Sequence, residues 1–397
     1  MDLFEKCRRF VRAEELRQAG LYPYFLPISE NLTEEVVIDG RRLVMVGSNN
    51  YLGLTHHPRV VEAARRAVDK YGSGCTGSRF LNGTLDLHVE LEDRLARFFR
   101  RDACITFSTG FQTNLGVIAT LVGKDDVVLC DRENHASIFD GCRLAFGEMK
   151  RYRHNDMDDL ERQLRACPPD AGRLIVTDGV FSMKGDLCDL PNIVRLAREY
   201  GARVRVDDAH GVGVLGKDGR GTCEHFGLED QVDVIVGTFS KSFASLGGFV
   251  VASHAVIDFV KHTGRALIFS ASITPASAAA ALAALDIVET EPERRERLWG
   301  HVSRMQAAFV DLGYDVALSK SAILPIPIGG EDLDTFRFWR KLHEEGVFAN
   351  PVVAPAVPPG EGMIRTSYMA THTEEELDRV VEVFARLGRE AGVLRVA

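Results

Sequence analysis

The sequence predicts an α/β protein in which a mainly parallel sheet lies between helices, with a smaller α+β domain at the C-terminal end. Two observations support this fold class. Between residues 103 and 252, short apolar runs alternate with amphipathic helical segments, which is the pattern of a parallel sheet covered on both faces. The chain also has 397 residues, 45% of them hydrophobic, and this length favours one large domain plus a smaller one.

Residues 1–47 are predicted to form an N-terminal arm and a hairpin. The first part, residues 2–25, is a charged, helix-compatible stretch that continues as an extended arm. Asp39-Gly40 then separates the apolar runs 36–38 and 43–46. An Asp-Gly pair between two such runs is a strong short-range hairpin signal.

The predicted large domain covers residues 48–289. It begins with a polar loop at 48–53 and a helix at 58–71, with Pro58 at the first helical position. The predicted strands are residues 103–107, 127–129, 174–177, 204–206, 234–236 and 249–252, and the predicted helices between them include 85–99 and 190–200.

The predicted small domain covers residues 290–397, where the regular alternation of apolar runs and helical segments ends. A long charged helix begins at Glu291, short strands follow at 323–328 and 363–368, and a final helix spans 374–388. Mixed short strands and helices of this kind indicate an α+β unit.

Charge and cysteine content exclude some classes of protein. A net charge of −9 disfavours a nucleic-acid binder. The eight cysteines contain no CxxC spacing, so we expect no metal site and reduced thiols, as in a cytoplasmic protein. The first residues lack a signal-peptide pattern, and no run reaches the roughly 18 apolar residues of a membrane span.

Gly211 to Gly216 match the GxGxxG pattern of dinucleotide-binding loops. The following residues, Lys217 to Gly221, have the composition of a turn and not of a phosphate-binding helix. Asp218 also stands where a P-loop needs Ser or Thr. We therefore interpret this stretch as a glycine-rich loop after a strand.

Lys241 is the first candidate for chemistry. It follows the apolar run 234–236 within a stretch of small and hydroxyl residues, at the strand end where α/β enzymes place their active sites. A lysine there can form a Schiff base with a carbonyl compound. Since a single lysine is usually a solvated surface residue, this hypothesis depends on its neighbours.

Three other segments end at the same predicted edge of the sheet. Gly110 and Phe111 begin a helix directly after a strand, where backbone N–H groups can bind a phosphate. His135 follows the next strand along the chain. Asp207 ends a buried strand and needs a positive partner, with His210 three residues later. Together with Lys241, these residues predict a pyridoxal 5'-phosphate site, in which a carboxylate keeps the pyridine ring charged.

With these residues in place, the chain resembles the α-oxoamine synthases of the fold-type I pyridoxal phosphate enzymes, from about Tyr22 to the C-terminal helix. The resemblance implies an aspartate aminotransferase-like fold with a mainly parallel seven-stranded sheet. The matching motifs are Ser48–Gly53, Asn134–Ser137, Asp178–Met183, Asp207–Gly211, Gly237–Lys241 and Ala370–Thr373.

The resemblance assigns a role to each matching position. Lys241 would be the Schiff-base lysine, His135 would stack on the cofactor, and Asp207 would pair with the pyridine nitrogen. The other implied positions are His210 at the ring's 3-oxygen; Gly110, Phe111, Ser182 and Thr238 at the cofactor; Ser270 and Ser272 at the phosphate of the partner subunit's cofactor; and Arg365 at the amino-acid carboxylate, with Asn50 and His135 also on the substrate side.

Within this family, residues 71–84 and 346–351 are most similar to the bacterial serine palmitoyltransferases. That similarity implies a decarboxylative condensation of L-serine with a long-chain acyl-CoA, in a homodimer with active sites at the subunit interface. Sibling synthases that use glycine or another amino acid, an aminotransferase on the same fold, and a non-catalytic regulatory paralogue stay open as alternatives. Peripheral contact with a membrane surface also stays open.

Overall fold

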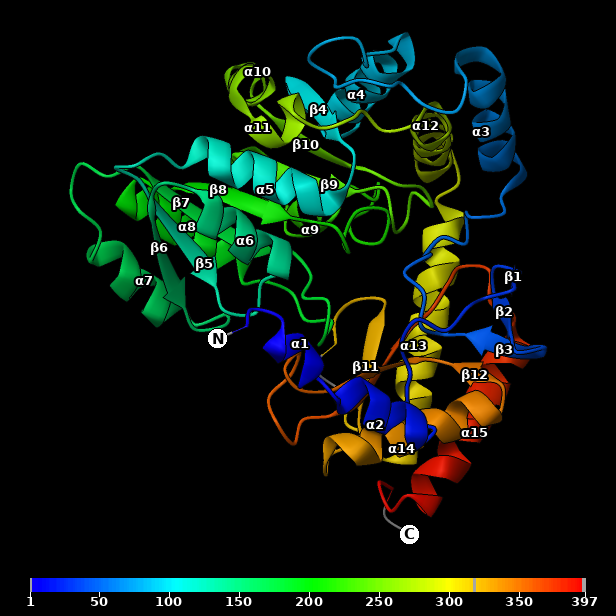
Figure 1. Cartoon of the computed structure of the whole chain (residues 1–397). Helices are drawn as coiled ribbons and strands as arrows, with labels where there is room; N and C mark the ends of the chain where they lie inside the picture. The colour runs from blue at the N-terminus through cyan, green and yellow to red at the C-terminus, as the bar shows by residue number, and fades with distance from the viewer. Residues whose placement is uncertain (1, 317–318, 395–397) are drawn as a thin grey trace. The chain divides into compact units, whose positions relative to one another are not determined.

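The computed structural model describes residues 2–316 and 319–394, and the chain divides into two compact units (Figure 1). The larger unit contains Asn49–Trp299 and Lys320–Ala322. The smaller unit contains Met1–Ser48, Gly300–Ser319 and Ile323–Ala397. The N-terminal segment therefore groups with the C-terminal part of the chain.

A seven-stranded sheet forms the centre of the larger unit, in the order β4-β10-β9-β8-β7-β5-β6. Its strands are β4 Ala103–Phe107, β5 Val127–Asp131, β6 Glu148–Tyr152, β7 Arg173–Asp178, β8 Arg203–Asp207, β9 Val234–Thr238 and β10 Gly248–Ala252. Only β10 runs antiparallel to its neighbours β4 and β9, so the predicted mainly parallel sheet is confirmed.

The six strands expected from apolar runs are all present, and β6 is the strand that the sequence did not predict. Its residues, Glu148 to Tyr152, are mostly polar, and Tyr152 is its one fully buried side chain. β6 is an edge strand that pairs only with β5. A strand with one neighbour and an exposed face does not need the continuous apolar run of a central parallel strand.

Helices cover the sheet of the larger unit. They are α3 Pro58–Tyr71, α4 Asp86–Phe98, α5 Gly110–Leu121, α6 Ala136–Leu144, α7 Met157–Arg165, α8 Leu190–Tyr200, α9 Thr222–His225, η1 Glu229–Gln231, α10 His254–Thr263, α11 Arg265–Ile268 and α12 Pro275–Thr290. Figure 1 shows α5 and α6 lying across the sheet. Ile118 of α5, Val122 directly after it and Ile138 of α6 pack with Val128 and Val176 of the sheet, which holds both helices against the sheet.

The smaller unit contains two short sheets and several helices. Its elements are α1 Glu5–Arg8, α2 Arg12–Gln18, β1 Glu30–Asn31, β2 Glu35–Ile38, β3 Arg41–Met45, β11 Ile323–Pro327, α14 Asp332–Glu344, β12 Val347–Phe348, β13 Asn350–Val352, β14 Met363–Ser367 and α15 Glu374–Glu390, while α13 Glu293–Leu312 belongs partly to each unit. The predicted hairpin is present as β2 and β3, and its turn residues Asp39 and Gly40 both have positive φ, 50° and 74°. Such a turn matches the right-handed twist of the strands.

None of the helices in the described part of the chain combines the length and the apolar character that a membrane span requires.

Candidate active site

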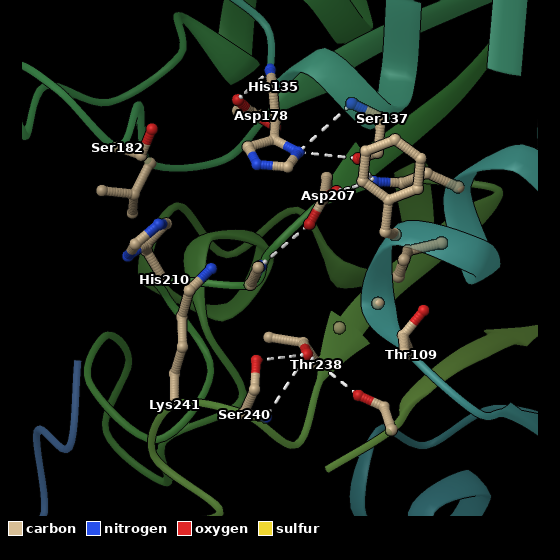
Figure 2. A pocket seen from close by; sticks show the side chains of 18 of the residues that line it. Thr109, His135, Ser137, Asp178, Ser182, Asp207, His210, Thr238, Ser240 and Lys241 are labelled. Carbon is tan, nitrogen blue, oxygen red and sulfur yellow. Dashed lines mark hydrogen bonds between the residues drawn. The ribbon is translucent and has the colours of Figure 1, made fainter. Parts of the chain in front are cut away.

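A cavity of about 300 Å³ opens at the carboxyl ends of the parallel strands in the larger unit. Figure 2 shows that its polar side chains come from several separate segments of the chain. The lining residues are Thr109, Gly110, Phe111, Asn114, His135, Ser137, Asp178, Val180, Ser182, Asp207, Ala209, His210, Val236, Gly237, Thr238, Ser240, Lys241, Leu246 and Gly247.

The first turn of α5 forms one end of the cavity. Thr109 caps this helix, because its hydroxyl accepts a 3.1 Å hydrogen bond from the Gln112 N–H. The amides of Gly110 and Phe111 precede that bond and lie at the helix end, where backbone N–H groups and the helix dipole favour an anion. A Cβ on Gly110 would lie 2.8 Å from Thr238 Oγ1, so only glycine allows β9 to approach the helix this closely.

Asp207 ends β8 with its carboxylate held on both oxygens. Oδ2 accepts from Asn114 Nδ2 at 2.6 Å, and Oδ1 accepts from the Ala209 N–H at 3.1 Å. Asp178 is its register partner on β7. Burial, and then the neighbouring charge of Asp207, raises the pKa of the Asp178 carboxyl well above its ordinary value. Burial next to another acid therefore disfavours the charged form of Asp178.

His135 precedes α6 and caps it. Its Nδ1 lies 2.7 Å from Ser137 Oγ and accepts from the Ser137 N–H at 3.3 Å. The backbone N–H of His135 donates to Asp178 Oδ2 at 2.9 Å. Burial lowers the pKa of the His135 ring, with Asp207 opposing this change and Lys241 adding to it, so the ring is neutral at neutral pH.

Lys241 lies on the loop after β9 and reaches toward the same space as the Asp207 carboxylate (Figure 2). This loop is tight: the Ala244 N–H donates to the Lys241 carbonyl at 2.9 Å, and Ala244 has a φ of 50°. His210 also lines the cavity, and its Nδ1 shares a 2.7 Å hydrogen bond with the buried Tyr51 hydroxyl. The site thus brings one amine together with the carboxyl groups of Asp178 and Asp207 and with two imidazoles.

Sequence comparison adds to this geometry. The family model described as "Aminotransferase class I and II" matches residues 41–384. This chain belongs to the class I and II aminotransferase family. The prediction of a pyridoxal phosphate enzyme family is thereby confirmed.

Several named relatives of the family cover nearly the whole chain. A serine palmitoyltransferase of Sphingobacterium spiritivorum is 51% identical over 98% of this chain and 98% of its own length. An 8-amino-7-oxononanoate synthase of Symbiobacterium thermophilum is 45% identical, over 96% and 97%. The solved serine palmitoyltransferase of Sphingomonas wittichii has a TM-score of 0.96 at 37% identity and full coverage of both chains. A structure of SPT with the PLP internal aldimine also has a TM-score of 0.96, with 37% identity and coverage of 99% and 100%.

Eight of the predicted site residues line the cavity described above. They are Gly110, Phe111, His135, Ser182, Asp207, His210, Thr238 and Lys241. Thr238 Oγ1 donates to the Gly247 carbonyl at 2.9 Å and lies 2.9 Å from Ser240 Oγ. The segments that the sequence placed at one edge of the predicted sheet therefore line one cavity.

The other four predicted residues do not line this cavity. Asn50 is buried, and its side chain bonds Thr55 Oγ1 at 3.0 Å and the Leu54 N–H at 2.9 Å. Ser270 and Ser272 line a small separate recess, where Ser272 Oγ donates to the Gly83 carbonyl at 2.6 Å. Arg365 lies on β14 in the smaller unit and is buried. Their roles toward substrate or the partner subunit's cofactor remain predictions.

Sequence reasoning missed Thr109, Asn114, Ser137 and Ser240 as cavity residues. A signal was present for Asn114, because it stands four residues after Gly110 on α5 and so faces the same side of the helix. Ser137 follows His135 at the start of α6. Lys184 Nζ lies 2.8 Å from Glu133 Oε1 and forms an ion pair with it.

The GxGxxG stretch has a structural role in this chain. Residues 211–221 form turns, and the next helix, α9, begins only at Thr222. The loop encloses the buried Asp208 carboxylate, which accepts from the Thr222 N–H at 2.6 Å. A Cβ on Gly221 would lie 2.1 Å from Asp208 Oδ2. The glycines therefore allow close backbone approach to a carboxylate, which agrees with the interpretation as a glycine-rich loop.

Proposed function

We propose that this chain is a pyridoxal phosphate-dependent acyltransferase that condenses L-serine with a long-chain acyl-CoA, palmitoyl-CoA being the preferred substrate. The products are 3-ketodihydrosphingosine, CoA and CO2, which makes the reaction the first step of sphingolipid synthesis. The observation that carries the proposal is the meeting of Lys241, Asp207 and the α5 N-terminus in one cavity, in a chain 51% identical to a named serine palmitoyltransferase over 98% of its length.

The residues of the cavity fit pyridoxal phosphate. The first turn of α5 suits the phosphate, and Gly110 leaves room for backbone approach. The Asp207 carboxylate suits a protonated ring nitrogen, since each of its oxygens accepts one protein hydrogen bond and retains acceptor capacity. Lys241 would hold the aldehyde carbon. When bound, this cofactor supplies an electron sink for a carbanion at the Cα atom of an amino acid.

The protein residues then have separate tasks. Once its amine is released, Lys241 is placed to take the proton from the serine Cα at its Nζ atom. Neutral His135 offers a ring face to stack on the cofactor without adding a second positive charge beside Lys241. His210, fixed by the Tyr51 hydroxyl, would donate to or accept from the cofactor's 3-oxygen.

Arg365 would bind the serine carboxylate. By fixing that group it would decide which bond at Cα stands perpendicular to the cofactor ring and therefore breaks. Orientation of this kind supplies about 7 kcal/mol or more in favourable cases.

The proposal includes a cytoplasmic homodimer whose active sites lie at the subunit interface. Exposed apolar side chains support a covered surface: Leu81 and Phe269 are 78% and 75% exposed. They flank the bridge between Ser78 and Ala271, next to the serines that the family resemblance directs to the partner. Such residues are costly to leave in water.

An absorbance titration of the pyridoxal phosphate-loaded protein tests the amino-acid substrate. L-serine should shift the cofactor band at lower concentration than glycine, L-alanine or L-threonine. The 45% identity to an 8-amino-7-oxononanoate synthase makes a sibling synthase the second candidate. A shift that saturates first with L-alanine would favour that candidate, and a protein without any cofactor band would refute the whole site.

A further inference from the structure

Arg205 is a fully buried arginine that the proposed reaction does not use. It lies on β8, two residues before Asp207 and so on the same face of the strand. Its side chain has 0% exposure. Within the described residues, its Nε and Nη1 atoms have no hydrogen-bond partner. A buried guanidinium is costly unless it is compensated, so its position requires an explanation.

Among the residues that the structure describes, the one side-chain hydrogen bond of Arg205 goes to Asn114 on α5, where Arg205 Nη2 donates to Asn114 Oδ1. Arginine is only a donor, and this fixes which way the Asn114 amide points. The Nδ2 atom of Asn114 must then face the opposite side, where it donates to Asp207 Oδ2 at 2.6 Å and to Ser137 Oγ at 2.7 Å.

The series of hydrogen bonds from Arg205 through Asn114 continues from Ser137 to His135. Ser137 Oγ accepts from Asn114 and lies 2.7 Å from His135 Nδ1, so its own proton is available to Nδ1. The Ser137 N–H also points at Nδ1. His135 Nδ1 is therefore an acceptor, and the proton of the neutral ring lies on Nε2, the nitrogen turned away from Ser137 (Figure 2).

Arg205 also lies behind Asp207 as seen from the cavity, since Asp207 and Asn114 line the cavity and Arg205 does not. Burial lowers the pKa of the guanidinium, and the groups whose charges oppose this change are Asp207, Cys142, Asp178 and Cys130. Among these charges, that of Asp207 has the largest effect on the guanidinium. The positive charge of Arg205 therefore stabilises the negative charge of Asp207.

We propose that Arg205 is a positioning residue that fixes the direction of the hydrogen-bond chain Arg205–Asn114–Ser137–His135 and whose charge stabilises the negative charge of Asp207 opposite the cofactor's ring nitrogen. The second part rests on the proposed function, whereas the tautomer of His135 does not. Arg205 thereby acts on both sides of the ring: on the carboxylate at its nitrogen and on the imidazole that stacks on it.

The first test uses the wild-type protein without cofactor, labelled with ¹⁵N-histidine and assigned with His135→Gln. His135 Nδ1 should give the chemical shift of an unprotonated ring nitrogen and Nε2 that of a protonated one. A wild-type protein in which His135 carries its proton on Nδ1 would overturn the proposal without any arginine variant.

The second test compares Arg205→Met, which removes donor and charge, with Arg205→Lys, which keeps a donor-only cation. In Arg205→Met, the Nδ1-protonated form of His135 should appear, and the ring nitrogen of bound ¹⁵N-pyridoxal phosphate should shift toward its unprotonated value. Arg205→Lys should restore most of both signals. The control is Arg203→Met on the same strand, whose side chain is 77% exposed and pairs with Asp233 at 2.8 Å, and it should leave both signals unchanged.

Unchanged signals in a folded Arg205→Met protein would contradict the proposal. Failure of the wild-type protein to bind pyridoxal phosphate would refute the proposed function. The His135 tautomer would still test the direction of the hydrogen bonds from Arg205 to His135, because that measurement needs no cofactor.

Discussion

At the scale of single residues, the function depends most on the one amine in the cavity. Lys241→Ala should lower the rate of CoA release by at least about a thousandfold, because the variant loses both the attachment point of the cofactor and the proton acceptor. The measurement is CoA release from palmitoyl-CoA in the presence of L-serine. Lys217→Ala, which replaces an exposed lysine outside the cavity, is the matched control. A Lys241→Ala protein with the wild-type rate would refute the assignment.

Single residues also show how far the sequence alone could predict the site. Lys241, Asp207 and His135 were found because each follows a strand, and strand ends meet at one edge of a parallel sheet. Asn114 and Ser137 were missed because their roles come from partners distant in the sequence: Asn114 bonds Asp207, 93 residues away. No local pattern marks a polar helix residue as a hydrogen-bond partner of a strand end.

At the scale of secondary-structure elements, the close contact between α5 and β9 can be tested at Gly110. In Gly110→Ala the new methyl group would lie 2.8 Å from Thr238 Oγ1 and 2.9 Å from its Cβ. Displacing the helix end by this overpacking should cost about 1–3 kcal/mol and weaken pyridoxal phosphate binding roughly tenfold or more. Equilibrium titration with pyridoxal phosphate, followed by fluorescence, measures this change.

Gly300→Ala on α13 is the matched control for that substitution. Among the described residues, and apart from the two chain neighbours and the backbone of the helix itself, no heavy atom lies within 4 Å of a Cβ at this position. Alanine there should raise the free energy of unfolding by about 0.5–1 kcal/mol, the usual helix-propensity difference, with unchanged cofactor affinity. Equal cofactor affinity in the two glycine variants would contradict the role given to the α5 terminus.

A second element-scale prediction concerns His154, which joins the end of β5 to the loop before α8. Its Nδ1 lies 3.0 Å from Asp131 Oδ1, and its Nε2 lies 2.7 Å from Asp186 Oδ2. Burial alone would lower the pKa of this ring, but the bonds to Asp131 and Asp186 outweigh burial and raise the pKa from 6.5 to about 10. Because the folded-state pKa is the higher one, the stabilisation is complete below pH 6.5 and is lost as the pH rises toward 10.

His154→Gln should therefore lower the free energy of unfolding by about 2 kcal/mol near pH 6. The difference from wild type should shrink as the pH approaches 10. Urea unfolding at several pH values measures it. His262→Gln, at an exposed histidine on α10, should change stability by less than about 0.5 kcal/mol. A His154→Gln deficit that grows with pH would contradict the ion-pair assignment.

Elements were predictable where burial dictates their pattern. The central strands β5, β7 and β9 contain apolar runs because both faces are covered. The edge strand β6 lacks that requirement and carries no such run. The antiparallel direction of β10 was also not apparent, because a strand's direction depends on the connection before it and not on its own composition.

At the scale of the whole molecule, the proposal predicts a homodimer. Leu81→Asp would place a charge on an apolar surface that a second subunit should cover. Sedimentation velocity should show the variant shifted toward monomer, with reduced CoA release at the same protein concentration. Val310→Asp, at a half-exposed position of α13 in the smaller unit, should remain dimeric. A wild-type protein that sediments as a monomer at micromolar concentration would refute this prediction.

The division into two units also limited what sequence reasoning could establish about substrate binding. Arg365 belongs to the smaller unit and Lys241 to the larger one. The role of Arg365 rests on family resemblance, since no pattern within either segment encodes the placement of one unit against the other. The cofactor end of the site, by contrast, lies entirely within the larger unit and follows from the order of its strands.

The measurement that tests the central claim most directly is the release of CoA and CO2 by the pyridoxal phosphate-loaded protein. Carboxyl-labelled L-serine with palmitoyl-CoA should give equimolar CoA and labelled CO2. The kcat/KM for palmitoyl-CoA should exceed that for acetyl-CoA or pimeloyl-CoA by roughly tenfold or more, because each methylene bound in an apolar site adds to the discrimination. Faster turnover of glycine with acetyl-CoA, or of L-alanine with pimeloyl-CoA, would contradict the claim.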